Sequence, residues 1–111
     1  MKHSYADYVP AMKALSDETR LKIIDMLSCG EMCACEILEE LSISQPTLSY
    51  HMKILSESGL VNAVRDGAWM RYTLRKKEFD ELKAFLQYIT SDKEDCICRK
   101  RKDEKPDERC C

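Results

Sequence analysis

Cysteine is the residue type in this chain that is best suited to chemistry, because a thiolate is both a nucleophile and a soft metal ligand. Seven cysteines stand among the 111 residues, at positions 29, 33, 35, 96, 98, 110 and 111. An odd count argues against a closed disulfide framework. The N-terminal segment has no apolar stretch typical of a secretory signal, so we expect a reducing, cytoplasmic compartment. Clustered cysteines in such a compartment more often bind metal or undergo redox chemistry than form structural disulfides.

Two Cys-x-Cys pairs are the candidate metal ligands: Cys33 with Cys35, and Cys96 with Cys98. Thiolates favour soft ions, which predicts As(III), Sb(III), Cd(II), Pb(II) or Bi(III) as the bound species rather than calcium or magnesium. Trivalent arsenic takes three thiolates, so a further sulfur must join Cys33 and Cys35. We predict Cys96 for this position and Cys98 next, with Cys29 as the remaining alternative. The sequence assigns no role to the last two cysteines of the chain.

The spacing of Cys33 and Cys35 has a geometric consequence. On a regular helix, residues two apart are separated by about 200°, so their sulfurs do not face one ion. The sulfurs converge only if the helix has not begun at Cys33 or if its first turn opens. We predict that ion binding distorts the start of this helix and disturbs the helix that follows. The alternatives are two partly buried cysteines without a ligand, and a pair that is oxidised as a redox signal.

Five helices and a hairpin are expected to position these residues. The predicted elements are a helix over Ser4–Leu15 (or one that starts near Pro10), a helix capped by Ser16 that stops at Gly30, a helix over Cys35–Leu41, a helix capped by Ser44 that runs to Ser58, strands over Leu60–Arg65 and Trp69–Arg75 joined by Asp66-Gly67, and a last helix over Lys77–Thr90. A three-residue turn joins the third and fourth helices, which is the helix-turn-helix arrangement. The predicted fold class is mainly α with a small β-hairpin, a winged helix-turn-helix domain in residues 1–91. Residues 92–111 are predicted to be a flexible, charged tail.

The fourth helix has the pattern of a helix that reads DNA. Leu48, Met52 and Leu55 have inward spacing, which turns polar side chains outward. The candidate DNA contacts are Gln45, Thr47, Ser49, Tyr50, His51 and Lys53 on this helix, with Arg65 and Arg71 on the hairpin. A half-buried histidine that packs or hydrogen-bonds is the alternative interpretation of His51. Because the net charge is only -2, affinity for DNA must come from such local positions or from a dimer.

The last helix carries a narrow apolar stripe. Phe79, Leu82, Leu86 and Ile89 follow heptad spacing, which is typical of a helix that pairs with another helix. The stripe therefore favours a homodimer, and the alternative is that it packs on its own domain. No run of about 18 apolar residues is present, so we expect no membrane span.

Residues 14–75 resemble the ArsR/SmtB family of winged-helix metalloregulatory repressors. The strings that carry the resemblance are Ala14-Leu15-Ser16-Asp17-Glu18-Thr19-Arg20-Leu21, Cys33-Ala34-Cys35-Glu36-Ile37-Leu38, Gln45-Pro46-Thr47-Leu48-Ser49-Tyr50-His51-Met52-Lys53-Ile54-Leu55, Ser58-Gly59-Leu60-Val61 and Trp69-Met70-Arg71-Tyr72. The resemblance implies a homodimer joined by its first and last helices, which binds operator DNA without metal and releases it when metal binds. The Cys33 and Cys35 pair is similar to the inducer site of arsenic-responsive and cadmium/lead-responsive members. A third cysteine of the arsenic-responsive pattern would fall on Leu38, where this chain departs from the family.

The function predicted from these features is a repressor that releases operator DNA when its cysteines bind arsenite or antimonite. The alternatives are a cadmium-, lead- or bismuth-responsive repressor of the same fold, and a thiol-redox-sensing transcriptional regulator. Zinc is less suited, because the two histidines lie far apart in sequence. An enzyme is not expected, since the chain has only three glycines, no phosphate-binding loop and no catalytic constellation. No required cofactor is expected either.

Overall fold

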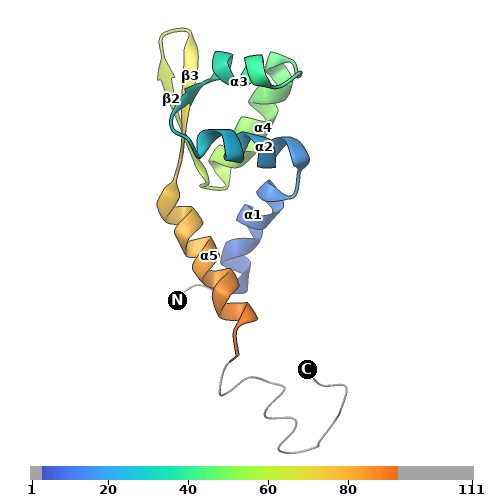
Figure 1. Cartoon of the computed structure of the whole chain (residues 1–111), viewed down its shortest axis with the longest axis vertical. Helices are drawn as coiled ribbons and strands as arrows, with labels where there is room; N and C mark the ends of the chain where they lie inside the picture. Colours follow the sequence, from blue (N-terminus) through green and yellow to red (C-terminus); the bar gives the residue numbers. More distant parts are fainter. Residues whose placement is uncertain (1–3, 93–111) are drawn as a thin grey trace, which may run out of the picture.

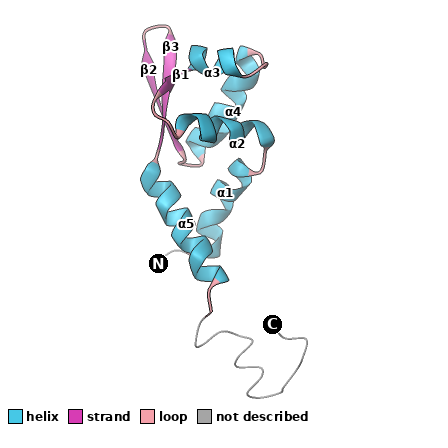
Figure 2. Ribbon diagram, in the orientation of Figure 1, coloured by secondary structure: helices cyan, strands magenta, loops and turns pink. Residues whose placement is uncertain are grey.

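The computed structural model describes residues 4–92 of the chain. Its elements, in order, are α1 (Tyr5–Leu15), α2 (Glu18–Leu27), β1 (Met32–Cys33), α3 (Ala34–Glu40), α4 (Gln45–Glu57), β2 (Val61–Asp66), β3 (Trp69–Leu74) and α5 (Lys76–Thr90). Helices dominate, and a small sheet stands at one end of the molecule (Figures 1 and 2). The predicted tail and its four cysteines, Cys96, Cys98, Cys110 and Cys111, lie outside the described residues, so the predicted domain boundary stays a prediction.

Side-chain caps set where the helices begin. Ser44 caps α4 as predicted, since its hydroxyl accepts a backbone N–H of the first turn at 3.2 Å. The cap of α2 is Asp17, whose carboxylate accepts the Arg20 N–H at 3.0 Å, and the prediction of Ser16 is wrong. Ser16 instead follows the end of α1, where its hydroxyl donates to the Lys13 carbonyl at 2.7 Å.

α1 runs without a break through Pro10, so the alternative start near that residue is wrong. The helix begins after Ser4, whose N–H donates to the Asp7 carboxylate at 2.9 Å. This cap satisfies a donor at the helix end and fixes the start before the proline. At the other boundary, α2 ends at Leu27, and the chain turns through Gly30 with φ 141°, a conformation that favours glycine.

The sheet has three strands in the order β1-β3-β2, one more than the predicted hairpin. β2 and β3 form the wing, joined through Gly67 at φ 63°, and Asp66 pairs with Trp69 beside this turn. β1 is antiparallel to β3, and Met32 pairs with Tyr72. A two-residue strand carries no alternating pattern, so the sequence could not reveal it. It matters because the segment that leads into α3 belongs to the sheet of the wing.

The main core lies where α2, α3 and α4 pack against the sheet. Its most deeply buried side chains are Ile23, Leu27, Ile37, Leu48, Met52, Leu55 and Leu60. The predicted inward stripe of α4 is confirmed, because Leu48, Met52 and Leu55 are all among them. This packing leaves the opposite face of α4 open to solvent.

α1 and α5 lie side by side at the end of the molecule opposite the wing tip (Figure 1). They share a separate small core of Tyr8, Leu82 and Phe85, in which the Tyr8 and Phe85 rings stack with centroids 4.0 Å apart. Half of the predicted α5 stripe is thus covered within the chain, while Leu86 and Ile89 stay exposed. Within residues 4–92, no helix combines the length and apolar character required to cross a bilayer.

Candidate metal and DNA-binding sites

Cys33 and Cys35 meet at the head of α3. Cys33 is the N-cap residue, with extended backbone angles of φ -86° and ψ 160°, and the helix begins only at Ala34. The two Cα atoms are 5.4 Å apart and the sulfurs are joined in a disulfide. Of the two geometries that let the sulfurs converge, the structure therefore has the first. The extended backbone at Cys33 already brings the sulfurs together, so their convergence does not require a helical turn to open.

The two cysteines of the pair lie in different surroundings. Cys33 is buried, and its N–H donates to the Glu36 carboxylate at 2.9 Å. The positive end of the α3 dipole lies at Cys33, which stabilises negative charge on a reduced sulfur there. Cys35 is partly exposed, so an ion can approach the pair from solvent. Reduction of the disulfide gives two thiol ligands in one place.

A third ligand is not found beside the pair in the described part of the chain. Among residues 4–92, no three or more His, Cys, Asp or Glu side chains gather closely enough to hold a metal ion. Cys29 is exposed and lines a different feature, an open hollow of about 370 Å³ that it shares with Met26, Met32 and Glu40. The predicted third ligands, Cys96 and Cys98, lie outside the described residues.

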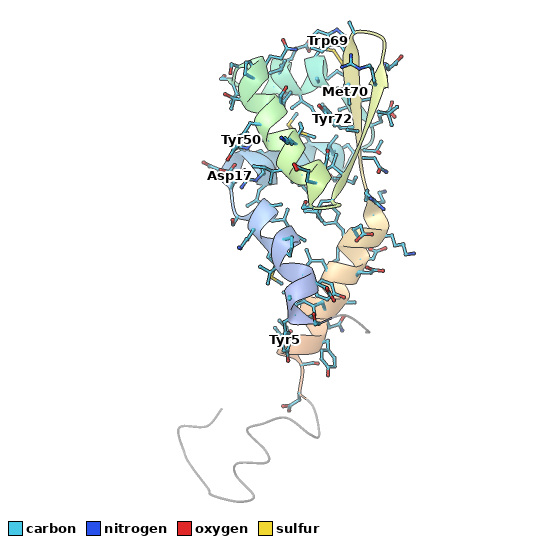
Figure 3. The ribbon with its side chains drawn as sticks, turned by 180° about the vertical axis from the view of Figure 1, so that it is seen from behind. Tyr5, Asp17, Tyr50, Trp69, Met70 and Tyr72 are labelled. Carbon is cyan, nitrogen blue, oxygen red and sulfur yellow. A yellow bond between two sulfur atoms is a disulfide. The ribbon has the colours of Figure 1, made fainter. Side chains whose placement is uncertain are left out.

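The outer face of α4 presents most of the predicted DNA contacts to solvent. The exposed candidates are Gln45, Thr47, Ser49, Tyr50 and Lys53. Ser44 holds the Thr47 side chain in place, since its hydroxyl donates to the Thr47 hydroxyl at 2.9 Å. Tyr50 is visible on the open side of this helix in Figure 3. Hydroxyl, amide, phenol and ammonium groups on one exposed face can contact base edges and phosphates.

His51 differs from the other candidates, because only 8% of it is exposed. The Arg20 guanidinium donates to its Nδ1 at 3.2 Å, and the Asp17 carboxylate lies 3.9 Å from the same nitrogen. Because an arginine can only donate, Nδ1 is the acceptor and the ring proton is on Nε2. The alternative of a histidine that packs and hydrogen-bonds thus describes His51 better than a phosphate contact does.

Arg20 of α2 contacts both α1 and α4, a role that no local sequence pattern indicates. Besides its bond to His51 on α4, it donates from Nε to the Ala14 carbonyl at the end of α1, at 2.6 Å. Its own N–H bonds to the Asp17 carboxylate and, with the charge of the guanidinium, holds the pKa of that carboxyl below its usual value. We call Asp17, Arg20 and His51 the Arg20 network. It joins α4 to α1 and α2.

The Arg20 network predicts a measurable coupling between two helices. We expect Arg20→Ala to lower the free energy of unfolding by about 2 kcal/mol, since it removes a charged hydrogen bond and strands buried acceptors. In a double-mutant cycle with His51→Ala, the double variant should lose less stability than the sum of the two single losses, by at least about 0.5 kcal/mol. Urea unfolding of the four proteins measures both quantities. Lys22→Ala is the control, because its ion pair with Glu18 is exposed and should contribute little. Full additivity would show that the two residues do not act together.

The two wing arginines lie in different surroundings. Arg65 is exposed on β2, opposite Met70, and is free to reach toward a DNA backbone. Arg71 is half-buried, and its Nε donates to the Asp66 carboxylate at 2.6 Å while its NH1 lies 3.4 Å from the Glu31 carboxylate. The pKa of Arg71 is raised, chiefly by the bond to Asp66. Arg71, which was predicted as a DNA contact, is thus engaged with carboxylates of the protein itself.

Comparison with known proteins decides the family. Residues 17–63 match the family described as "Bacterial regulatory protein, arsR family". The chain is 43% identical to the "Arsenical resistance operon repressor" of Staphylococcus aureus over 96 residues, an alignment that covers 86% of this chain and 92% of that protein. This chain belongs to the arsR family.

Further relatives of this arsR-family chain agree. An "Arsenical resistance operon repressor" of Staphylococcus xylosus is 41% identical over 89% of this chain and 95% of its own length. Among solved structures, HlyU from Vibrio cholerae N16961 aligns with a TM-score of 0.67 and 32% identity over 81% of this chain and 98% of its own. The predicted family and the predicted winged helix-turn-helix fold are therefore confirmed, and the chain is a transcriptional regulator by class.

Proposed function

We propose that this arsR-family protein represses transcription by binding operator DNA, and that arsenite or antimonite releases it by binding Cys33 and Cys35. The observation that carries the proposal is the convergence of these two sulfurs at the head of α3, the helix that directly precedes α4 in the chain. The names of the most similar relatives support arsenic as the inducer. Cadmium, lead and bismuth share the preference for thiolates and are the alternatives within the same site.

The chemistry at the pair begins with reduction. A dithiol reductant reduces the disulfide to two thiols and is itself oxidised to a disulfide. Arsenous acid then forms two As–S bonds, and the two thiol protons leave with two of its hydroxyl groups as water. A third thiol completes the site in the same way, and Cys96 remains our first choice for it, with Cys98 next. The chain thus contributes two ligands from one rigid element and a third from beyond residue 92.

DNA binding follows from the exposed face of α4 and from the wing. Gln45, Ser49 and Tyr50 would lie toward base edges, and Lys53 and Arg65 toward phosphates. The protein has a net charge of only -2, so each cation at the interface counts. His51 would act indirectly, because its hydrogen bond to Arg20 holds the helix that carries these contacts. Arg71 would orient the wing.

A homodimer would place two such faces on neighbouring half-sites of an operator. The described chain leaves an apolar face uncovered on α1 and α5, where the exposed fractions are 41% for Val9, 42% for Leu86 and 39% for Ile89. These residues continue the small core of Tyr8 and Phe85 outward. A second copy of the chain would bury them, which is more favourable than leaving a contiguous apolar patch in water.

Titration of arsenite into a complex of the reduced protein with its operator tests the proposal. We expect release of the DNA at about one arsenite per chain. X-ray absorption at the arsenic edge then counts the sulfur ligands, and three are expected. A protein that binds arsenite through fewer than two sulfurs, or that keeps its DNA when loaded, would contradict the proposed function.

Oxidation should block the response to arsenite. Hydrogen peroxide converts the two thiols into one disulfide and two molecules of water, which removes both ligands. We expect the oxidised protein to hold its operator with arsenite present and to release it once a phosphine reductant is added. Mass spectrometry of the peptide with Cys33 and Cys35 verifies the oxidation state. If oxidation alone releases DNA, the trigger is redox, which is the second candidate function and the one that the disulfide itself favours.

A further inference from the structure

Cys33 belongs to the sheet of the wing as well as to the cysteine pair. Its main chain is the partner of Arg71 across β1 and β3. Glu31 lies two residues before it, and the Arg71 guanidinium reaches that carboxylate at 3.4 Å. The segment that carries the pair is therefore joined to β3 twice, once by the strand pairing and once by an ion pair.

The same guanidinium also reaches the far end of the wing. Arg71 donates from Nε to Asp66 at 2.6 Å, and Asp66 is the last residue of β2 before the turn. One planar group with several donors thus joins the wing tip to the segment in front of Cys33, a task that suits arginine better than lysine. The α3 residue Glu36, which accepts the Cys33 N–H, adds a third carboxylate whose charge acts on Arg71.

We propose that Arg71 is a positioning residue that transmits the state of the Cys33 and Cys35 pair to the wing. This inference rests on the proposed function in one respect, that arsenite binds at the pair. In the reduced protein no bond joins the two sulfurs, and an arsenic atom bound to both restrains them at one separation. Cys33 must then shift, and the shift moves its strand partner Arg71 and loosens the contacts that hold Asp66 and Glu31. The wing changes its orientation without any unwinding of α3.

The chain contains a natural reporter of this movement. Trp69 is the only tryptophan, and it pairs with Asp66 at the tip of the wing, two residues from Arg71 (Figure 3). With 39% of it exposed, its emission should depend on how the wing packs. Fluorescence of the reduced protein in the absence of DNA therefore reads the wing directly.

The test titrates arsenite into four reduced proteins and follows Trp69 emission, with arsenite binding measured in parallel by equilibrium dialysis. We expect a change that saturates at one arsenite per chain in the wild type, and none in Cys33→Ser/Cys35→Ser. In Arg71→Gln, binding should persist while the amplitude falls at least about fivefold, because the link to the wing is lost. Arg75→Gln is the matched control and should respond like the wild type, since Arg75 is similarly exposed and its ion pair with Glu78, at 3.9 Å, is a local one.

Each outcome decides the proposal. A full amplitude of the emission change in Arg71→Gln would mean that arsenic acts on Trp69 without Arg71. A wild type that binds arsenite with no change in Trp69 emission would mean that the wing is not coupled to the cysteine pair. Either result overturns the role of Arg71. A wild type whose Trp69 responds while operator stays bound would uphold the coupling and refute the proposed function. Failure to bind arsenite would refute both. Arg71→Lys, which keeps the charge but not the fork, should give an intermediate amplitude and covers the case in which the glutamine variant folds poorly.

Discussion

The Cys33→Ser/Cys35→Ser variant should bind its operator as tightly as the wild type and ignore arsenite. Serine hydroxyls do not form the thiolates that a soft metalloid requires, so the inducer site is lost. The fold should persist, because Cys33 is the N-cap of α3 and serine is among the preferred residues at that position. Arsenite should lower operator affinity of the wild type by about 5- to 150-fold and that of the variant not at all. Fluorescence anisotropy of labelled operator DNA measures both ratios.

Cys29→Ser provides the control for this experiment. Cys29 is exposed and lines the separate hollow with Met26 and Met32, so its loss should leave the response to arsenite unchanged. A serine at Cys96 should weaken arsenite binding without removing it, because two ligands remain. A normal response from the double variant would place the inducer site elsewhere in the chain.

Charges on the outer face of α5 should separate the dimer and thereby remove tight operator binding. Leu86→Glu/Ile89→Glu puts two carboxylates where two apolar side chains would be buried against a second copy. Each such side chain contributes about 1.5–3 kcal/mol on burial. The dissociation constant of the dimer should rise by at least about 100-fold. Sedimentation equilibrium measures this constant, and operator affinity should fall with it because each monomer reaches only one half-site.

Ala84→Glu/Gln87→Glu is the matched control. It adds the same two charges to α5, on exposed positions that lie away from the apolar stripe. Its dimer constant and its operator affinity should stay close to those of the wild type at moderate salt. Equal losses in both variants would point to a general charge effect on DNA binding, and a wild type that is monomeric at micromolar concentration would remove the dimer from the proposal.

Local sequence patterns carried most of the fold prediction. The helices and the wing were predicted to within a few residues, since apolar spacing, Ser44, the Asp66-Gly67 turn and Gly59 each encode a local structure. The boundary at Asp17 was missed, because serine and aspartate are both good caps and stand next to each other in the sequence. The structure decides this competition for Asp17, whose carboxylate accepts the backbone N–H of Arg20 in the first turn of α2.

The parts of the candidate site that the sequence did not reveal are contacts between distant segments. Nothing in the residue spacing indicates that Arg20 hydrogen-bonds to His51, thirty-one residues later in the chain. Nor does it indicate that Arg71 contacts both Asp66 and Glu31. The sequence could not choose between the two geometries that let the Cys33 and Cys35 sulfurs converge, for a related reason. The two-residue strand β1 holds Cys33 in extended form, and this pairing depends on Tyr72 and Arg71 from much farther along the chain.

The N-cap position of Cys33 has an evolutionary consequence. A residue there must end an extended segment and start a helix, and the side chains that do this well in place of cysteine are serine, threonine, aspartate, asparagine and glycine. None of these supplies a sulfur, so under the proposed function any of these substitutions would remove a ligand for the metalloid. Donors elsewhere are free to migrate, and Leu38, one turn along α3, is a position where a cysteine could be gained. Diversification of metal preference in such regulators should therefore proceed around a fixed first ligand, and designers of arsenic biosensors can tune detection range through the others.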